Sequence, residues 1–211
     1  DPESDIYFTT NGSTPTTASE KYTKPLILTT TTTVKAVAYR EELGYSFVTE
    51  ADFVKVDLNK KITVLSTCHS SYTAGGPDAL IDGMRGAENW RLGGWQGYQG
   101  TDFEAIIDLG RIKSVQHLSA GFVQDIRSWI WMPKEVTFYG SIDGKTFAKI
   151  ATVKNSVPVD DYEIQSHNLK AKTSTRTRYV KVMATNFGTI PSWHLGADGQ
   201  AFIFVDEIEV D

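Results

Sequence analysis

The stretch Phe103-Glu104-Ala105-Ile106-Ile107-Asp108-Leu109 decides the fold of this chain. Apolar residues occupy every second position from Phe103 to Leu109, while Glu104 and Asp108 fall between them. Successive side chains of a strand point to opposite faces, so this spacing places the apolar residues on one face and the carboxylates on the other. The stretch is therefore predicted to be a strand with one face in a hydrophobic core.

The same alternation recurs downstream, around Val136 and Phe138 and again from Val180 to Ala184. No stretch carries the sustained apolar spacing of an amphipathic helix. Asp143-Gly144 tolerates positive φ and separates two such runs, which indicates a hairpin. We therefore predict an all-β chain whose strands, divided by turns, form sandwiches.

Charge and composition exclude several classes of protein. The 211 residues are 40% hydrophobic and carry a net charge of -5, which is typical of a globular protein and unfavourable for binding nucleic acid. The basic run from Lys170 to Arg178 is interpreted as a solvated turn. Cys68 is the only cysteine, so an intrachain disulfide is excluded, and no apolar run is long enough to span a membrane.

A polar break at Leu58-Asn59-Lys60-Lys61 divides a Thr-rich front segment from a Trp-rich and Gly-rich rear segment. We predict two domains, 1–58 and 59–211. In the front segment, Thr29 to Thr33 leads into a strand from Val34 to Tyr39, because β-branched residues favour extended backbone. Asn11-Gly12-Ser13 fits the acceptor pattern for N-glycosylation, although a tight turn explains it better.

The front segment resembles the small immunoglobulin-like module on the C-terminal side of chitobiase and β-hexosaminidase catalytic domains. The residues that carry the resemblance run from Ile6 to Thr16, from Tyr22 to Pro25 and from Thr33 to Tyr39. The resemblance implies a small β-sandwich that acts as a spacer or brace. Such modules usually begin with further strands, so the chain is expected to start inside this domain.

The rear segment resembles the coagulation factor 5/8 type C domain, a discoidin-like jelly-roll β-sandwich that includes the family 32 carbohydrate-binding modules. The landmarks that carry the resemblance occur in order along the segment: Ala79 to Gly83, Trp95, Glu104 to Gly110, Pro133 to Val136, Ser141 to Phe147, Arg178 to Val182, and Asp206 to Ile208. The Trp-rich variant is similar to modules appended to bacterial hexosaminidases, which agrees with the front segment.

The resemblance also implies a structural calcium ion where an Asp-Gly turn meets the last strand. Calcium takes six to eight oxygen ligands, many of them backbone carbonyls. The expected ligands are Ala79, Asp82, Met84, Asn89 and Glu207. Glu88 is an alternative to Asn89, because the family pattern has Thr or Ser shortly before a Trp, whereas this loop reads Gly86-Ala87-Glu88-Asn89-Trp90. The alternative to a calcium site is that Asp82 only caps a turn and Glu207 faces solvent.

All five tryptophans lie in the rear segment. A sugar site needs an aromatic platform beside polar groups that hold hydroxyls, and loops on a rigid sandwich usually present such residues. Packing is the favoured interpretation for Trp90, Trp95 and Trp131, and ligand contact for Trp193. The candidate carbohydrate-binding residues are Arg91, Trp95, Gln124, Asp125, Trp129, Trp193 and His194.

The sequence thus predicts a non-catalytic, monomeric carbohydrate-binding fragment of a secreted glycoside hydrolase with a hexosaminidase-like parent, at an extracellular, periplasmic or cell-surface location. Its partners are a glycan and the parent's catalytic domain. The alternative is a structural brace that packs on the catalytic domain without a sugar site. Catalysis by the fragment is not expected, because neighbouring carboxylates such as Asp160-Asp161 and Asp206-Glu207 point to opposite faces of a strand and do not face each other across a cleft.

Overall fold

The structure is a computed structural model that describes residues 3–211, and it divides into two compact units, Asp1–Lys55 and Val56–Asp211. Residues 3–211 contain strands and three short 3-10 helices and no α-helix, so the all-β prediction is confirmed. None of the helices in this range is long and apolar enough to cross a membrane.

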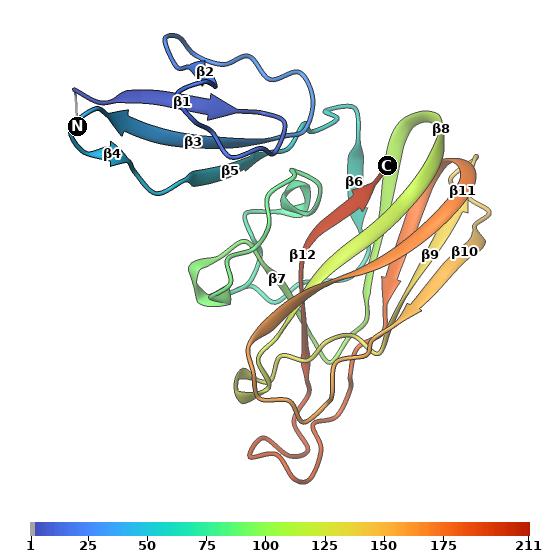
Figure 1. Ribbon diagram of the computed structural model, residues 1–211. Coiled ribbons are helices and arrows are strands. Elements are labelled where there is room, and N and C mark those ends of the chain that lie inside the picture. The colour runs from blue at the N-terminus through green and yellow to red at the C-terminus, as the bar shows by residue number, and fades with distance from the viewer. Residues whose placement is uncertain (1–2) are drawn as a thin grey trace. The chain divides into compact units, whose positions relative to one another are not determined.

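The first unit consists of one connected antiparallel sheet (Figure 1). Its strands are β1 (Asp5–Thr9), β2 (Glu20–Lys21), β3 (Thr32–Arg40), β4 (Gly44–Tyr45) and β5 (Thr49–Phe53). The expected strand from Val34 to Tyr39 is the centre of β3, which pairs with β1 along one edge and with β4 and β5 along the other. Phe8 and Val37 are its buried apolar side chains.

The second unit contains a seven-stranded antiparallel sheet with the order β10-β9-β11-β8-β12-β7, in which β6 also pairs with β8. Its strands are β6 (Lys61–Val64), β7 (Gln96–Gln99), β8 (Phe103–Gln124), β9 (Glu135–Ser141), β10 (Ala148–Lys154), β11 (Gln165–Ala184) and β12 (Phe202–Val210). The 3-10 helices are η1 (Pro77–Leu80), η2 (Trp90–Leu92) and η3 (Ile126–Ser128).

The sheet becomes a sandwich because its two longest strands turn over together at one end (Figure 1). Gly110, at φ 76°, lies at the corner of β8, and the pairing of β8 with β11 shifts register on either side of the corner. Before the corner β8 pairs with β6 and the second half of β11, and after it with β12 and the first half of β11. One continuous pair of strands therefore contributes to both layers.

The main core lies between these layers, where the apolar face of the stretch from Phe103 to Leu109 is fully buried as predicted. A second cluster forms on the outer face of the β8–β12 layer, where Trp95 packs with Val123, Ile130 and Phe204. The segment before β7 covers this face. Arg85 fastens that segment, since its Nε lies 3.1 Å from the buried Asp206 carboxylate.

Candidate functional site

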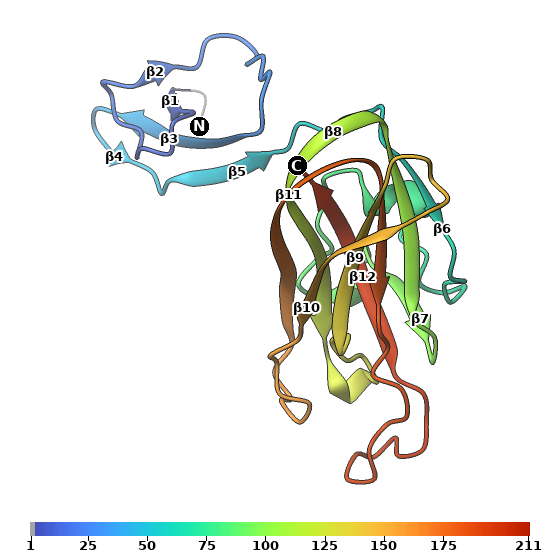
Figure 2. The ribbon, with the colours of Figure 1, turned by 90° about the vertical axis from the view of Figure 1, so that its right-hand side faces the viewer.

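Three loops gather at the end of the sandwich opposite the turned-over strands, and in Figure 2 they lie at the bottom of the second unit. They are residues 125–131 after β8, residues 155–164 between β10 and β11, and residues 185–201 between β11 and β12. Each loop exposes an aromatic side chain: Trp129 is 38% exposed, Tyr162 39% and Trp193 48%. We call these three residues the aromatic platform.

Trp129 is held by an unusual backbone conformation directly after η3. Its φ of 66° lies in the left-handed region, which is an outlier for a bulky residue and costs on the order of 1–3 kcal/mol. Its indole lies against the glycines of the third loop, because a Cβ placed on Gly196 would come within 2.5 Å of the ring nitrogen. Strain of this kind is retained where the surrounding structure fixes it, often at a functional site.

Tyr162 and Trp193 flank the ring of His194. The ring centroids of Tyr162 and His194 are 6.3 Å apart in a stacked arrangement, and those of Trp193 and His194 are 5.8 Å apart edge to face. His194 is itself buried against Trp131, and its Nδ1 accepts a hydrogen bond of 2.9 Å from the Gly196 amide. His194 is therefore the internal support for two exposed rings.

Cationic and polar groups border the platform. Arg127 lies over the Tyr162 ring and donates a hydrogen bond of 2.8 Å to the Tyr162 carbonyl, which joins the first two loops. On the other side, Nη2 of Arg91 donates to the Ser128 hydroxyl at 2.7 Å, and more weakly to the buried Asp125 carboxylate at 3.5 Å. The Arg127 guanidinium is thereby positioned beside the exposed Tyr162 ring, and Arg91 is tied to the residue that precedes Trp129.

The buried Asp125 carboxylate holds together the residues of this border. Besides Arg91, it accepts hydrogen bonds from the Trp90 indole at 3.0 Å and from the Ser128 hydroxyl at 2.8 Å. The guanidinium carbon of Arg91 lies 4.2 Å from the centroid of the Trp90 ring. Asp125 is buried, so its role is to fix the residues around it.

Four of the seven predicted sugar contacts are buried, namely Trp95, Gln124, Asp125 and His194. Trp95 is only 3% exposed, and its ring lies so close to Gly86 that a Cβ there would overlap it. Gln124 is also buried; its amide group donates to the Pro158 and Asp161 carbonyls and accepts from the Met132 amide. The burial of Trp95 agrees with the packing interpretation favoured for it, whereas the expectation that Gln124 contacts a ligand from an exposed loop is corrected, because its amide holds the loop at Pro158 and Asp161.

Sequence reasoning missed Tyr162 and Arg127. Tyr162 stands in the acidic run Asp160-Asp161-Tyr162-Glu163, whose composition indicates only a polar loop. Arg127 follows Gln124-Asp125 in a segment whose helical turn was not anticipated. The available signal was that Tyr162 is the single aromatic residue in the loop 155–164 between two strands.

A buried acidic group lies at the predicted calcium site. Glu207 is 4% exposed, and its Oε2 has no hydrogen-bond partner. Burial raises the pKa of Glu207 to about 8; the Gly83 amide partly offsets this, and the nearby charge of Asp82 adds to the rise. An orphaned carboxylate oxygen beside a second carboxylate fits a hard cation such as calcium, which prefers oxygen ligands.

The remaining ligands of such an ion must come largely from the main chain. In the part of the chain that the structure describes, no three His, Cys, Asp or Glu side chains cluster in a way that holds a metal. The Asp82 carboxylate accepts a hydrogen bond of 2.8 Å from the Met84 amide, so the turn from Asp82 to Met84 is tight. Asn89 is engaged differently, since its side-chain oxygen caps η2 by accepting from the Arg91 amide.

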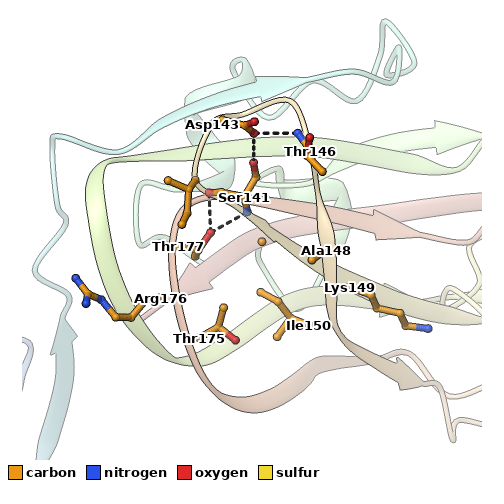
Figure 3. Close-up of a pocket in the computed structure, with 11 residues that line it drawn as sticks. Ser141, Asp143, Thr146, Ala148, Lys149, Ile150, Thr175, Arg176 and Thr177 are labelled. Atoms are coloured by element: carbon orange, nitrogen blue, oxygen red, sulfur yellow. Dashed lines mark hydrogen bonds between the residues drawn. The ribbon is translucent and has the colours of Figure 1, made fainter.

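A separate concavity of about 430 Å³ lies at the β9–β10 hairpin, and Figure 3 shows that its polar groups bond to one another. Asp143 accepts from the Ser141 hydroxyl and from the Lys145 and Thr146 amides, as expected for the predicted Asp143-Gly144 turn. Thr177 binds the Ser141 backbone through its hydroxyl. These groups stabilise the turn, and no aromatic ring lines the concavity.

Two family models match the chain. One, described as Fn3 associated, matches residues 1–53, and the other, described as F5/8 type C domain, matches residues 61–198. A comparison with curated proteins found no match.

Several solved structures are similar to this chain. CpGH89CBM32-5 from Clostridium perfringens, in complex with GalNAc-β-1,3-galactose, is 18% identical with a TM-score of 0.45, over 72% of this chain and 94% of that one. The family 32 module of NanJ from the same organism, in complex with galactose, is 11% identical with a TM-score of 0.43, over 72% and 93%. A putative chitobiase fragment from Bacteroides thetaiotaomicron is 16% identical with a TM-score of 0.46, over 71% and 87%.

Proposed function

This chain belongs to the F5/8 type C domain family through residues 61–198, and from that premise we propose that its second unit binds glycans without catalysing their cleavage. The observation that carries the proposal is the aromatic platform, in which Trp129, Tyr162 and Trp193 leave the interior at one end of a rigid sandwich. The family's fold supports many functions, so the argument rests on this site.

The platform suits the two kinds of surface that a sugar presents. The exposed rings of Trp129 and Trp193 would cover the apolar C–H face of a pyranose. Arg91 and Arg127, fixed by hydrogen bonds to the Ser128 hydroxyl and the Tyr162 carbonyl, would donate to the hydroxyl belt. A small, open site of this kind gives weak and reversible binding, which becomes effective through proximity when the module is linked to an enzyme.

The parent protein in this proposal is a secreted glycoside hydrolase of the hexosaminidase type, with the module acting outside the cell or at its surface. The Fn3-associated match over residues 1–53 supports an accessory arrangement, in which the first unit is a spacer. The module would keep the catalytic domain near its substrate.

Calcium is proposed as a structural component of the second unit. Glu207, Asp82 and the main-chain carbonyls of Ala79 and Met84 would hold it, and the ion would neutralise a carboxylate that the fold otherwise buries without a partner. Its contribution would be to stabilise the segment before β7. That segment carries Arg91 to the border of the platform.

The test of the sugar site is a calorimetric titration of this chain with mono- and oligosaccharides at millimolar concentration. Binding that is lost in Trp193→Ala and kept in Ile142→Ala supports the proposal, since Ile142 is also exposed but lies on the β9–β10 hairpin, far along the sandwich from the platform. If no saccharide binds and the chain instead binds a parent catalytic domain, the second unit is a structural brace.

A further inference from the structure

An open cavity of about 610 Å³ lies next to the aromatic platform, between the turn at η2 and the start of β11. This volume falls within the about 300–1,000 Å³ typical of small-molecule sites. Six residues line it, of which all but Ile164 have polar side chains: Glu88, Asn89, Arg91, Ile164, Gln165 and Ser166. We call it the side cavity.

The side cavity and the platform share structural elements. Arg91 lines the cavity and also donates to Ser128, the residue before Trp129. Ile164, half exposed in the cavity wall, follows Tyr162 by two residues. A ligand that lies on the platform rings therefore has the side cavity as its neighbour.

Two polar groups of the side cavity are available to a ligand. Within residues 3–211, no hydrogen bond or ion pair engages the Glu88 carboxylate or the Ser166 hydroxyl. Gln165, in contrast, is held by Asp161 and His167 and forms a fixed wall. A wall that offers free acceptors and donors together suits vicinal hydroxyls, since each hydroxyl both donates and accepts.

The charges of the side cavity favour a neutral ligand. Arg91 offers a cation, and Glu88, three residues earlier in the chain, adds an anion to the lining of the same cavity. The carboxylate of an acidic sugar would be attracted by Arg91 but repelled by Glu88, whereas a neutral hydroxyl can form hydrogen bonds with both side chains.

We propose that the side cavity is a second sugar subsite, so that this module binds a neutral oligosaccharide of two or more units across the platform and the cavity. The inference rests on the proposed glycan-binding function, because the platform supplies the first subsite. The glycan recognised would then be an internal or extended chain, and a single terminal sugar would fill only half of the site.

The test compares N-acetylglucosamine with its β-1,4-linked di- and trisaccharides, galactose with N-acetyllactosamine, and galacturonic acid with its dimer, all by calorimetry. For at least one neutral pair, the longer sugar should bind about tenfold more tightly than the monosaccharide. Ser166→Ala and Glu88→Ala should weaken oligosaccharide binding by about two- to tenfold, the effect of one lost hydrogen bond, and leave monosaccharide binding unchanged. Ser174→Ala, an exposed serine near the corner of β11, is the matched control and should change neither.

Equal affinities for mono- and oligosaccharides, or cavity variants with no effect on oligosaccharides, overturn the second subsite while leaving the platform in place. Preference for the acidic dimer over every neutral oligosaccharide overturns the assignment of a neutral ligand. Failure of every sugar to bind the unmodified chain overturns the glycan-binding function and the second subsite together.

Discussion

Replacing Trp193 by alanine tests the platform at its most exposed ring. Trp193 is 48% exposed, and a Trp side chain presents up to about 250 Å². A sugar that covers about half of the exposed part would remove roughly 60 Å² of apolar surface from water, worth about 1.5 kcal/mol at ~25 cal/mol per Å². The variant should therefore bind saccharide about tenfold more weakly.

The assay is a pair of measurements on the same preparations. Calorimetric titration gives the change in affinity, and thermal unfolding shows whether the fold has changed. Because the ring is half exposed and touches mainly Tyr162 and His194, the midpoint of unfolding should move little. An unchanged affinity, or a loss of affinity only in proportion to a loss of stability, would refute the assignment of Trp193 to the site.

Three other perturbations follow from the structure. Gly196→Ala should push the Trp129 ring out of place, because the added Cβ would lie 2.5 Å from its nitrogen, and titration should show weaker saccharide binding. Calcium at about a hundred times its Kd should add about 2.7 kcal/mol to the free energy of unfolding, and both EDTA and Glu207→Gln should abolish this gain in chemical denaturation. The Arg178 ion pair lowers the pKa of Asp108, so its contribution, under about 1 kcal/mol, is present above about pH 4 and lost as pH falls through the lowered value; the stability difference between the wild type and Asp108→Asn should shrink on acidification.

Much of the architecture was predictable because burial on one face leaves a period-2 pattern in the sequence. The stretch from Phe103 to Leu109 and the Asp143-Gly144 turn behave as their local chemistry indicates. The corner in β8 was not predicted, because the period-2 pattern stops at Leu109 and a single glycine does not distinguish the end of a strand from a bend that carries it into the other layer.

The sequence identified some of the exposed residues of the candidate site, but it did not distinguish them from buried residues in similar segments. Trp129 and Trp193 come to the surface, yet Trp95 and Gln124, from segments with similar composition, do not. A tryptophan near a turn packs inward when a partner such as Gly86 leaves space for its ring, and that partner is set by the tertiary fold. Tyr162 joins the platform for the same reason, because its loop meets the others only in the folded chain.

The most direct measurement is the nuclear magnetic resonance signal of the five indole N–H groups during titration with an oligosaccharide. The proposed function predicts progressive shifts for Trp129 and Trp193, while Trp95, whose indole is buried and bonded to the Ala87 carbonyl, stays in place as an internal reference. Saturating oligosaccharide that leaves the Trp129 and Trp193 signals unmoved would contradict a sugar site at this end of the sandwich.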